Sequence, residues 1–188
     1  MTTSIITSLR QTSRNYSDHV DYPKQPGIYG FVLADTSTLG QFGQGGQLLY
    51  IGISKDSLHS RDFNQHFKSG QSGRSTLRRS LGAVLRDKLK LKAIPRGGTN
   101  DTKRFDNYKF TADGEEKLTE WMLQNLKIGY WVFKDTMDYR LLRQHEDAVI
   151  RELRPTLDLD PRTKKLNPLA DTLIALRHVC KDEATRNA

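Results

Sequence analysis

Three runs of branched and aromatic residues predict the strands of this chain, at residues 28–33, 48–53 and 128–133. The first two runs are separated by a Gly- and Gln-rich connection, which favours a hairpin. Side chains two positions apart on a strand share one face of a sheet. A hairpin between these runs is therefore expected to bring Tyr29 and Tyr50 together on one side.

Apolar residues at helical spacing predict helices over about 57–68, from Ser75 onward, over 114–126, over 138–153 and from Asn167-Pro168 onward. The expected capping residues are Ser75, Asp113, Asp138 and Asn167. In the helix after Ser75, the arginines at 74, 78, 79 and 86 fall outside the apolar stripe, so they are expected to face away from the core. Residues 95–107 read as a loop and 108–111 as a short strand.

This pattern predicts an α+β fold, with a small, three-stranded, mainly antiparallel sheet flanked by helices. The expected organisation is an N-terminal arm without clear periodicity over 1–22, a main domain over 23–160 and a C-terminal helix packed on it over 161–188. Within the main domain, residues from about 89 to 126 form an added helical elaboration. The chain of 188 residues, 36% apolar, is long enough for one ordinary core.

Charge and cysteine content narrow the class of protein. The single cysteine, Cys180, excludes an internal disulfide and suits a reducing compartment. No apolar run is long enough for a membrane span. A cytoplasmic protein without a membrane partner is therefore expected. The formal net charge is +8, and residues 55–109 hold fourteen Lys and Arg against five Asp and Glu. This basic third favours nucleic acid as a partner, and a solvated basic surface is the alternative.

The tripeptides Gly27-Ile28-Tyr29 and Tyr50-Ile51-Gly52 resemble the motif that gives the GIY-YIG nuclease family its name. The resemblance implies a three-stranded sheet flanked by helices and a divalent-metal-dependent DNA endonuclease that leaves 5′-phosphate and 3′-hydroxyl ends. It assigns Arg61 and His66 to the family's arginine and histidine on the helix after the second tripeptide.

The spacing of Arg61 and His66 departs from the family pattern of four residues. Five residues place them about 140° apart on an ideal α-helix. Three explanations are open: the helix begins after Arg61, a local bulge realigns the pair, or one of the two lies outside the site. His59 and His145 are alternative histidines.

Glu146 lies on the apolar stripe of its predicted helix, four residues after Leu142 and three before Val149. A carboxylate there is costly to bury unless it is paired or binds a cation. The resemblance implies that Glu146 binds a single Mg²⁺ or Mn²⁺ ion, whereas an arginine partner is the alternative. The family's asparagine after the following proline is replaced by Asp158, and Asn167 is expected to lie too far along the chain.

The resemblance also implies a mechanism. Tyr29, its pKa lowered by Arg61, Lys55 or His66, would accept a proton from the attacking water, Tyr50 would position that water, and Arg61 would stabilise the phosphoryl charge. The residues predicted to contact nucleic acid are Lys55, Arg74, Arg78 and Arg79.

Two other functions remain open, a nucleic-acid-binding module that keeps the fold without turnover and a non-enzymatic interaction protein with a basic face. Restriction, repair and mobile-element homing are all compatible with the family. Cleavage of both strands by one site per chain would favour a homodimer, although no sequence feature shows one.

Overall fold

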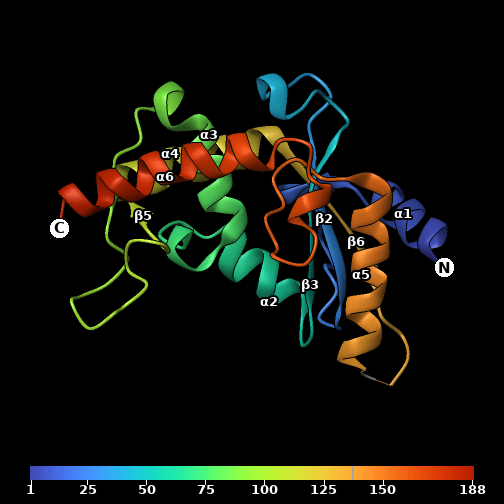
Figure 1. The fold of residues 1–188 in the computed structure, drawn as a ribbon. Coiled ribbons are helices and arrows are strands. Elements are labelled where there is room, and N and C mark those ends of the chain that lie inside the picture. Colours follow the sequence, from blue (N-terminus) through green and yellow to red (C-terminus); the bar gives the residue numbers. More distant parts are fainter. Residues whose placement is uncertain (137) are drawn as a thin grey trace.

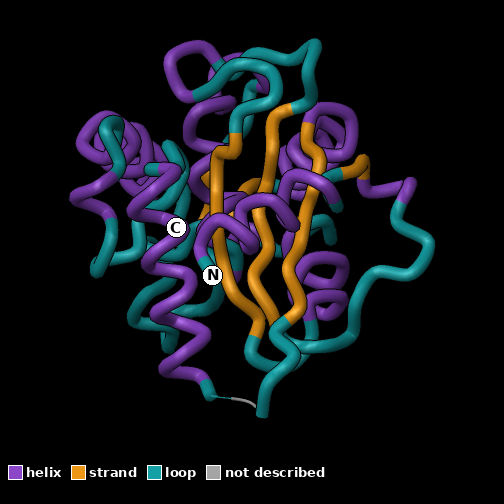
Figure 2. Tube along the Cα trace, turned by 90° about the vertical axis from the view of Figure 1, so that its right-hand side faces the viewer, coloured by secondary structure: helices purple, strands orange, loops and turns teal. Residues whose placement is uncertain are grey.

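Three long antiparallel strands organise the fold in the computed structural model, which describes residues 1–136 and 138–188 (Figure 1). The central strand is β2 (Gly27–Leu33), flanked by β3 (Leu48–Ser54) and β6 (Leu126–Val132). The short strand β1 (Arg14–Asn15) extends the sheet beyond β6, giving the order β1-β6-β2-β3. Figure 2 shows the three long strands side by side. The predicted α+β class and the predicted hairpin are confirmed.

Helices cover both faces of this sheet. On one face, α1 (Thr2–Gln11) and α5 (Tyr139–Leu153) pack over a core that includes Ile28 and Ile51. The opposite face carries Tyr29, Phe31 and Tyr50, which belong to the larger core formed with the remaining helices. The alternation of side chains along β2 and β3 thus sends both motif tyrosines to the same face, as expected.

The remaining helices and short strands, which form the layer on this second face, all follow the hairpin in the chain. The long helix α3 contacts both α4 and α6 (Figure 1). Among the described helices, none is long and apolar enough to cross a bilayer. In chain order these elements are α2 (Leu58–Arg61), a π-helical segment (Asp62–His66), a 3₁₀ turn (Ser72–Arg74), α3 (Thr76–Leu89), β4 (Ala93–Ile94) paired with β5 (Lys109–Phe110), α4 (Ala112–Asn125), a 3₁₀ turn (Lys164–Leu166) and α6 (Ala170–Arg186).

The N-terminal residues differ from the aperiodic arm expected from the sequence. They form α1, whose buried residues Ile5, Ile6 and Leu9 pack against the sheet and α5. The helix approaches β6 so closely that a Cβ atom at Gly129 would lie 1.9 Å from the carbonyl oxygen of Leu9. Three apolar residues among many Ser and Thr are too weak a pattern to predict this helix without its packing partner.

The predicted caps at Ser75 and Asp138 are confirmed, since each side chain accepts backbone hydrogen bonds at the start of its helix. The cap predicted at Asp113 is wrong, because α4 starts earlier and is capped by Thr111. The last helix starts at Ala170, after the predicted Asn167. The Oδ1 atom of Asn167 accepts the backbone N–H of Leu169 just before the helix, and its Nδ2 donates to two backbone carbonyls of the preceding segment.

Candidate active site

Tyr29 lies on the central strand β2, on the face of the sheet that carries the larger core, and is only 1% exposed. Its phenolic oxygen accepts a hydrogen bond from Arg61 Nε at 3.3 Å and lies 2.8 Å from His66 Nε2. The strand register places Gly52 of the second tripeptide directly opposite Tyr29. A Cβ atom at position 52 would lie 2.4 Å from the Tyr29 hydroxyl, so glycine is needed there for the tyrosine to keep its place.

The five-residue spacing of Arg61 and His66 is explained by the π-helical segment that follows α2. Its hydrogen bonds join residues five apart, as from Phe67 N to the Asp62 carbonyl at 2.9 Å. Five residues therefore make about one turn, and both side chains reach the Tyr29 hydroxyl. The local bulge is the correct explanation of the three. π-Bulges within helices are often found at functional sites.

The alternative histidines lie elsewhere. The ring of His59 stacks on that of Phe63, with the ring centroids 5.0 Å apart. The ring of His145 packs edge-to-face against Trp131, with a centroid distance of 5.8 Å. His66 is the histidine that contacts Tyr29.

The second nitrogen of the His66 ring is fixed by Ser75. Nδ1 lies 2.8 Å from Ser75 Oγ, which also accepts the backbone N–H of Arg78 at the start of α3. Both ring nitrogens thus have partners, and the side chain is fully buried. The sequence marks Ser75 as a helix cap, but its contact with the histidine depends on the tertiary fold.

Burial lowers the pKa of His66 well below its usual value of 6.5, and Arg61 and Arg78 add to the effect. Below pH 6.5 the unfolded imidazole binds a proton that the folded one does not, so acid favours unfolding. We expect the wild type to lose stability relative to His66→Gln by roughly 1 kcal/mol per pH unit below 6.5. Urea unfolding of both proteins at pH 5 to 8 measures this, and a difference independent of pH would contradict it.

The environment of the two tyrosines differs from the sequence expectation. Burial raises the pKa of Tyr29 and of Tyr50, and the nearby Arg61 only partly opposes this. The expected lowering of the Tyr29 pKa is therefore wrong, because loss of hydration outweighs one guanidinium. The two rings are stacked with centroids 6.4 Å apart. A free phenolate is disfavoured, so Tyr29 needs a partner that takes its own proton.

Glu146 lies on the buried stripe of α5, as its spacing predicts, and is 4% exposed. Its Oε2 atom accepts hydrogen bonds from Arg143 at 2.8 Å and Arg162 at 3.1 Å. The arginine-paired alternative is therefore observed. Burial raises the pKa of Glu146, while the two arginines oppose this. The negative charge of Glu146 also raises the pKa of both tyrosines.

Asp158 adds a second buried carboxylate close to Glu146. Its Oδ1 accepts the backbone N–H of Asp160 at 2.9 Å, whereas its buried Oδ2 has no partner among the described residues. Burial raises the pKa of Asp158 to about 6, and the charge of Glu146 adds to this.

Asn167 is not too far along the chain, contrary to expectation. The chain folds back through the 3₁₀ turn at Lys164–Leu166, and Asn167 Nδ2 donates to the carbonyls of Thr156 and Asp158, each at 2.9 Å. It thereby holds the segment that carries Asp158.

The basic residues predicted to contact nucleic acid fall into two groups. Arg78 is 0% exposed and Arg79 7% exposed, so neither faces solvent as expected. Their guanidinium groups are taken up by contacts inside the protein, which removes them from the predicted surface. Lys55 and Arg74 are exposed.

The exposed basic residues line two clefts, one of which also contains Arg61, the partner of Tyr29. Lys55 lines a cleft of about 360 Å³ together with Arg61, Gln65 and Arg143. Arg74 lines a neighbouring cleft of about 630 Å³. Gln65 joins the two, since it accepts from Arg61 Nη1 and donates to the Arg74 carbonyl at 2.7 Å.

The paired tyrosines, the arginine and histidine on the following helix and the buried glutamate define a nuclease-type site on an α+β sheet. The family model described as GIY-YIG catalytic domain matches residues 33–178, more than half of the chain. The chain belongs to the GIY-YIG family, as the two tripeptides suggest. The matched range includes Tyr50, Arg61, His66 and Glu146 and begins just after Tyr29. No curated protein and no solved structure matches the chain.

Proposed function

We propose that this protein is a divalent-metal-dependent DNA endonuclease that produces 5′-phosphate and 3′-hydroxyl ends. The observation that carries the proposal is the Tyr29 hydroxyl held between Arg61 Nε and His66 Nε2. The π-helical segment supports turnover over the non-catalytic alternative, because it brings Arg61 and His66 to the same hydroxyl despite their unusual spacing.

Proton transfer in this proposal runs through Tyr29 to His66. One lone pair of the phenolic oxygen accepts from Arg61, and the other is available to the attacking water. As the water proton moves to Tyr29, the phenolic proton moves to His66 Nε2, so no free phenolate forms. This requires the His66 tautomer that carries its proton on Nδ1 and donates to Ser75 Oγ. The water oxygen bonds to phosphorus, the P–O3′ bond breaks, and the leaving 3′ oxygen takes a proton from solvent to become the 3′-hydroxyl.

Arg61 and Tyr50 complete the reaction centre in this proposal. The Arg61 side chain lines the cleft and carries a positive charge toward the phosphoryl oxygens, whose negative charge grows in the transition state. That growing charge also offsets the cost of protonating His66 between Arg61 and Arg78. Tyr50, stacked beside Tyr29, orients the water.

A divalent ion fits the carboxylates on this side of the site. Glu146 Oε1 accepts no hydrogen bond within the described residues, and Asp158 Oδ2 is a buried oxygen without a partner. No group of three or more His, Cys, Asp and Glu suited to a metal occurs among those residues. Mg²⁺ is commonly bound by one or two carboxylates together with water and phosphate oxygens. Glu146, with Asp158, would hold Mg²⁺ or Mn²⁺, and the ion would stabilise negative charge on the leaving oxygen.

Lys55 and Arg74 are the DNA contacts that the structure supports. Both are exposed and line clefts, Lys55 the one that contains Arg61 and Arg74 the one linked to it through the hydrogen bonds of Gln65. Contacts of this kind go to phosphates and position a duplex without reading its sequence.

The test of the proposed function is incubation of the full-length protein with supercoiled plasmid and with branched DNA, in Mg²⁺ and in EDTA. We expect cutting in Mg²⁺ alone, with ends that DNA ligase rejoins without further treatment. Salt-sensitive binding without cutting on any substrate would support the non-catalytic module instead.

A further inference from the structure

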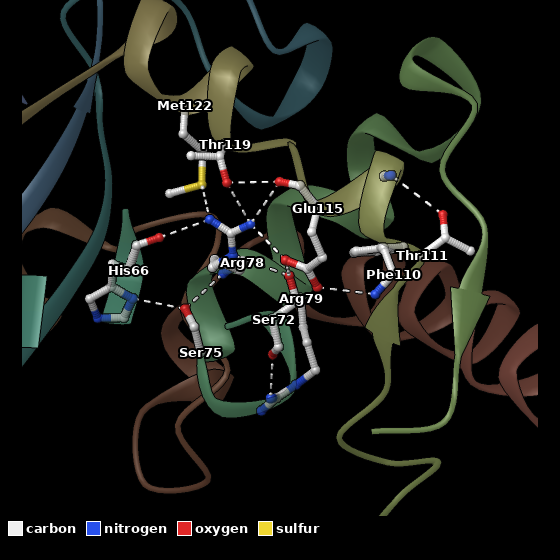
Figure 3. Close-up of polar contacts among 11 residues, drawn as sticks. His66, Ser72, Ser75, Arg78, Arg79, Phe110, Thr111, Glu115, Thr119 and Met122 are labelled. Atoms are coloured by element: carbon white, nitrogen blue, oxygen red, sulfur yellow. Dashed lines mark hydrogen bonds and ion pairs between the residues drawn. The ribbon is translucent and has the colours of Figure 1, made fainter. Parts of the chain in front are cut away.

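Arg78 is a fully enclosed charged residue next to the site. Its side chain is 0% exposed, and all of the guanidinium nitrogens donate hydrogen bonds to groups inside the protein (Figure 3). Nη2 pairs with Glu115 Oε2 of α4 at 2.7 Å, and Nε donates to Ser72 Oγ at 3.2 Å. Nη1 donates to the backbone carbonyl of His66 at 3.0 Å. One side chain thus links α3, α4 and the end of the π-helical segment.

Fold stability alone does not account for this pair. Both charges are removed from water, and replacing a buried ion pair with apolar residues of similar size is often neutral or stabilising. Glu115 is itself almost fully engaged, accepting from Arg78 and Ser72 through Oε2 and from the Phe110 backbone through Oε1. Removing both charges from water costs free energy, and in return the network holds its partner groups in fixed positions. One of these partners belongs to the candidate active site.

That group is His66, whose backbone the guanidinium holds directly. The helical segment ends at His66, so its carbonyl lacks a partner within the helix, and Arg78 Nη1 supplies one. The ring of His66 contacts Ser75 Oγ, which caps α3 by accepting the backbone N–H of Arg78. The guanidinium therefore fixes the His66 backbone next to the helix start that holds the ring.

We propose that Arg78, oriented by Glu115, is a positioning residue that fixes His66 against the Tyr29 hydroxyl. In this way α4, which belongs to the helical elaboration of the domain, takes part in building the reaction centre without touching substrate. The catalytic consequence rests on the proposed function, whereas the effect on the His66 ring is independent of it.

The test replaces the pair together, as Arg78→Met with Glu115→Leu, so that no buried charge is left alone. The matched control is Arg86→Met with Glu183→Leu, which removes another ion pair of α3, to α6 at 3.2 Å. We expect the first variant to fold and to lose about 10²-fold in kcat with little change in KM, because His66 is displaced. The control is expected to keep the wild-type kcat.

The second readout is the ¹⁵N NMR spectrum of the histidine rings, with His66 assigned by its absence in His66→Gln. We expect a single tautomer in the wild type and in the control, and exchange between tautomers in the Arg78 variant. Unchanged kcat and an unchanged tautomer in a folded Arg78 variant would overturn the proposal. If the wild type cuts no DNA but the tautomer follows this pattern, the positioning role stands and the nuclease assignment fails.

A conservative variant covers the case in which the double variant does not fold. Arg78→Lys keeps the charge opposite Glu115 but lacks the planar fork that reaches Glu115, Ser72 and the His66 carbonyl together. We expect it to fold, with loss of kcat and of the fixed tautomer. Wild-type values for both, or failure of both variants to fold, would show that the pair serves only the fold and would overturn the proposal.

Discussion

Replacing Tyr29 with phenylalanine is expected to reduce DNA cleavage by about 10²- to 10⁴-fold, the range for loss of a general base. The hydroxyl is the group that lies between Arg61 and His66, and without it the water proton has no path to the imidazole. The ring is buried and contacts the rings of Phe31 and Tyr50, so Tyr29→Phe should retain the fold. Single-turnover cleavage of a labelled duplex, with DNA binding measured alongside, tests the prediction.

Tyr108→Phe is the matched control for this substitution. Tyr108 is also 1% exposed, and its hydroxyl donates to the Arg79 carbonyl at 3.1 Å, away from Tyr29. This control should lose about 1 kcal/mol of stability and keep its cleavage rate. Cleavage by Tyr29→Phe at the rate of the control would remove Tyr29 from the reaction.

Glu146→Gln is expected to remove metal-dependent cleavage, with a loss on the order of 10³-fold. Glutamine keeps the size of the side chain and an acceptor for Arg143 and Arg162, but it takes away the charge that would hold the cation. A metal that stabilises the transition state contributes several kcal/mol, which corresponds to about that factor in rate. Calorimetric titration with Mn²⁺ should show weaker binding in parallel with the lost cleavage.

The control for this prediction is Asp147→Asn. Asp147 is the next residue on α5 and also pairs with Arg162, at 3.0 Å. Its substitution therefore removes an ion pair with the same arginine but leaves the Glu146 carboxylate in place. Cleavage and Mn²⁺ binding should both be retained. Full Mg²⁺-dependent cleavage by Glu146→Gln would show that the carboxylate serves only as the partner of its two arginines.

The sequence predicts this fold where a local pattern suffices. The strands around Tyr29 and Tyr50 alternate clearly, and the spacing of Glu146 between Leu142 and Val149 is enough to place its carboxylate on the buried side of α5. The family relationship follows from the two tripeptides and is confirmed by the match over 33–178.

The features that the sequence does not predict depend on tertiary contacts. A π-helical segment has no residue signature of its own, so the alignment of Arg61 with His66 is visible only in three dimensions. Arg78 looks like a surface arginine because its partner, Glu115, is 37 residues away in the chain. The pKa of Tyr29 depends on how completely the surrounding layers exclude water.

The close approach of Tyr29 to Gly52 also has an evolutionary consequence. A Cβ atom at position 52 would lie 2.4 Å from the Tyr29 hydroxyl oxygen and 2.5 Å from Cζ of its ring. The constraint on the glycine therefore holds as long as an aromatic ring stands at position 29. A relative with a small residue in place of the tyrosine is free to replace the glycine as well, so the joint loss of both residues should mark lineages in which this site no longer catalyses a reaction.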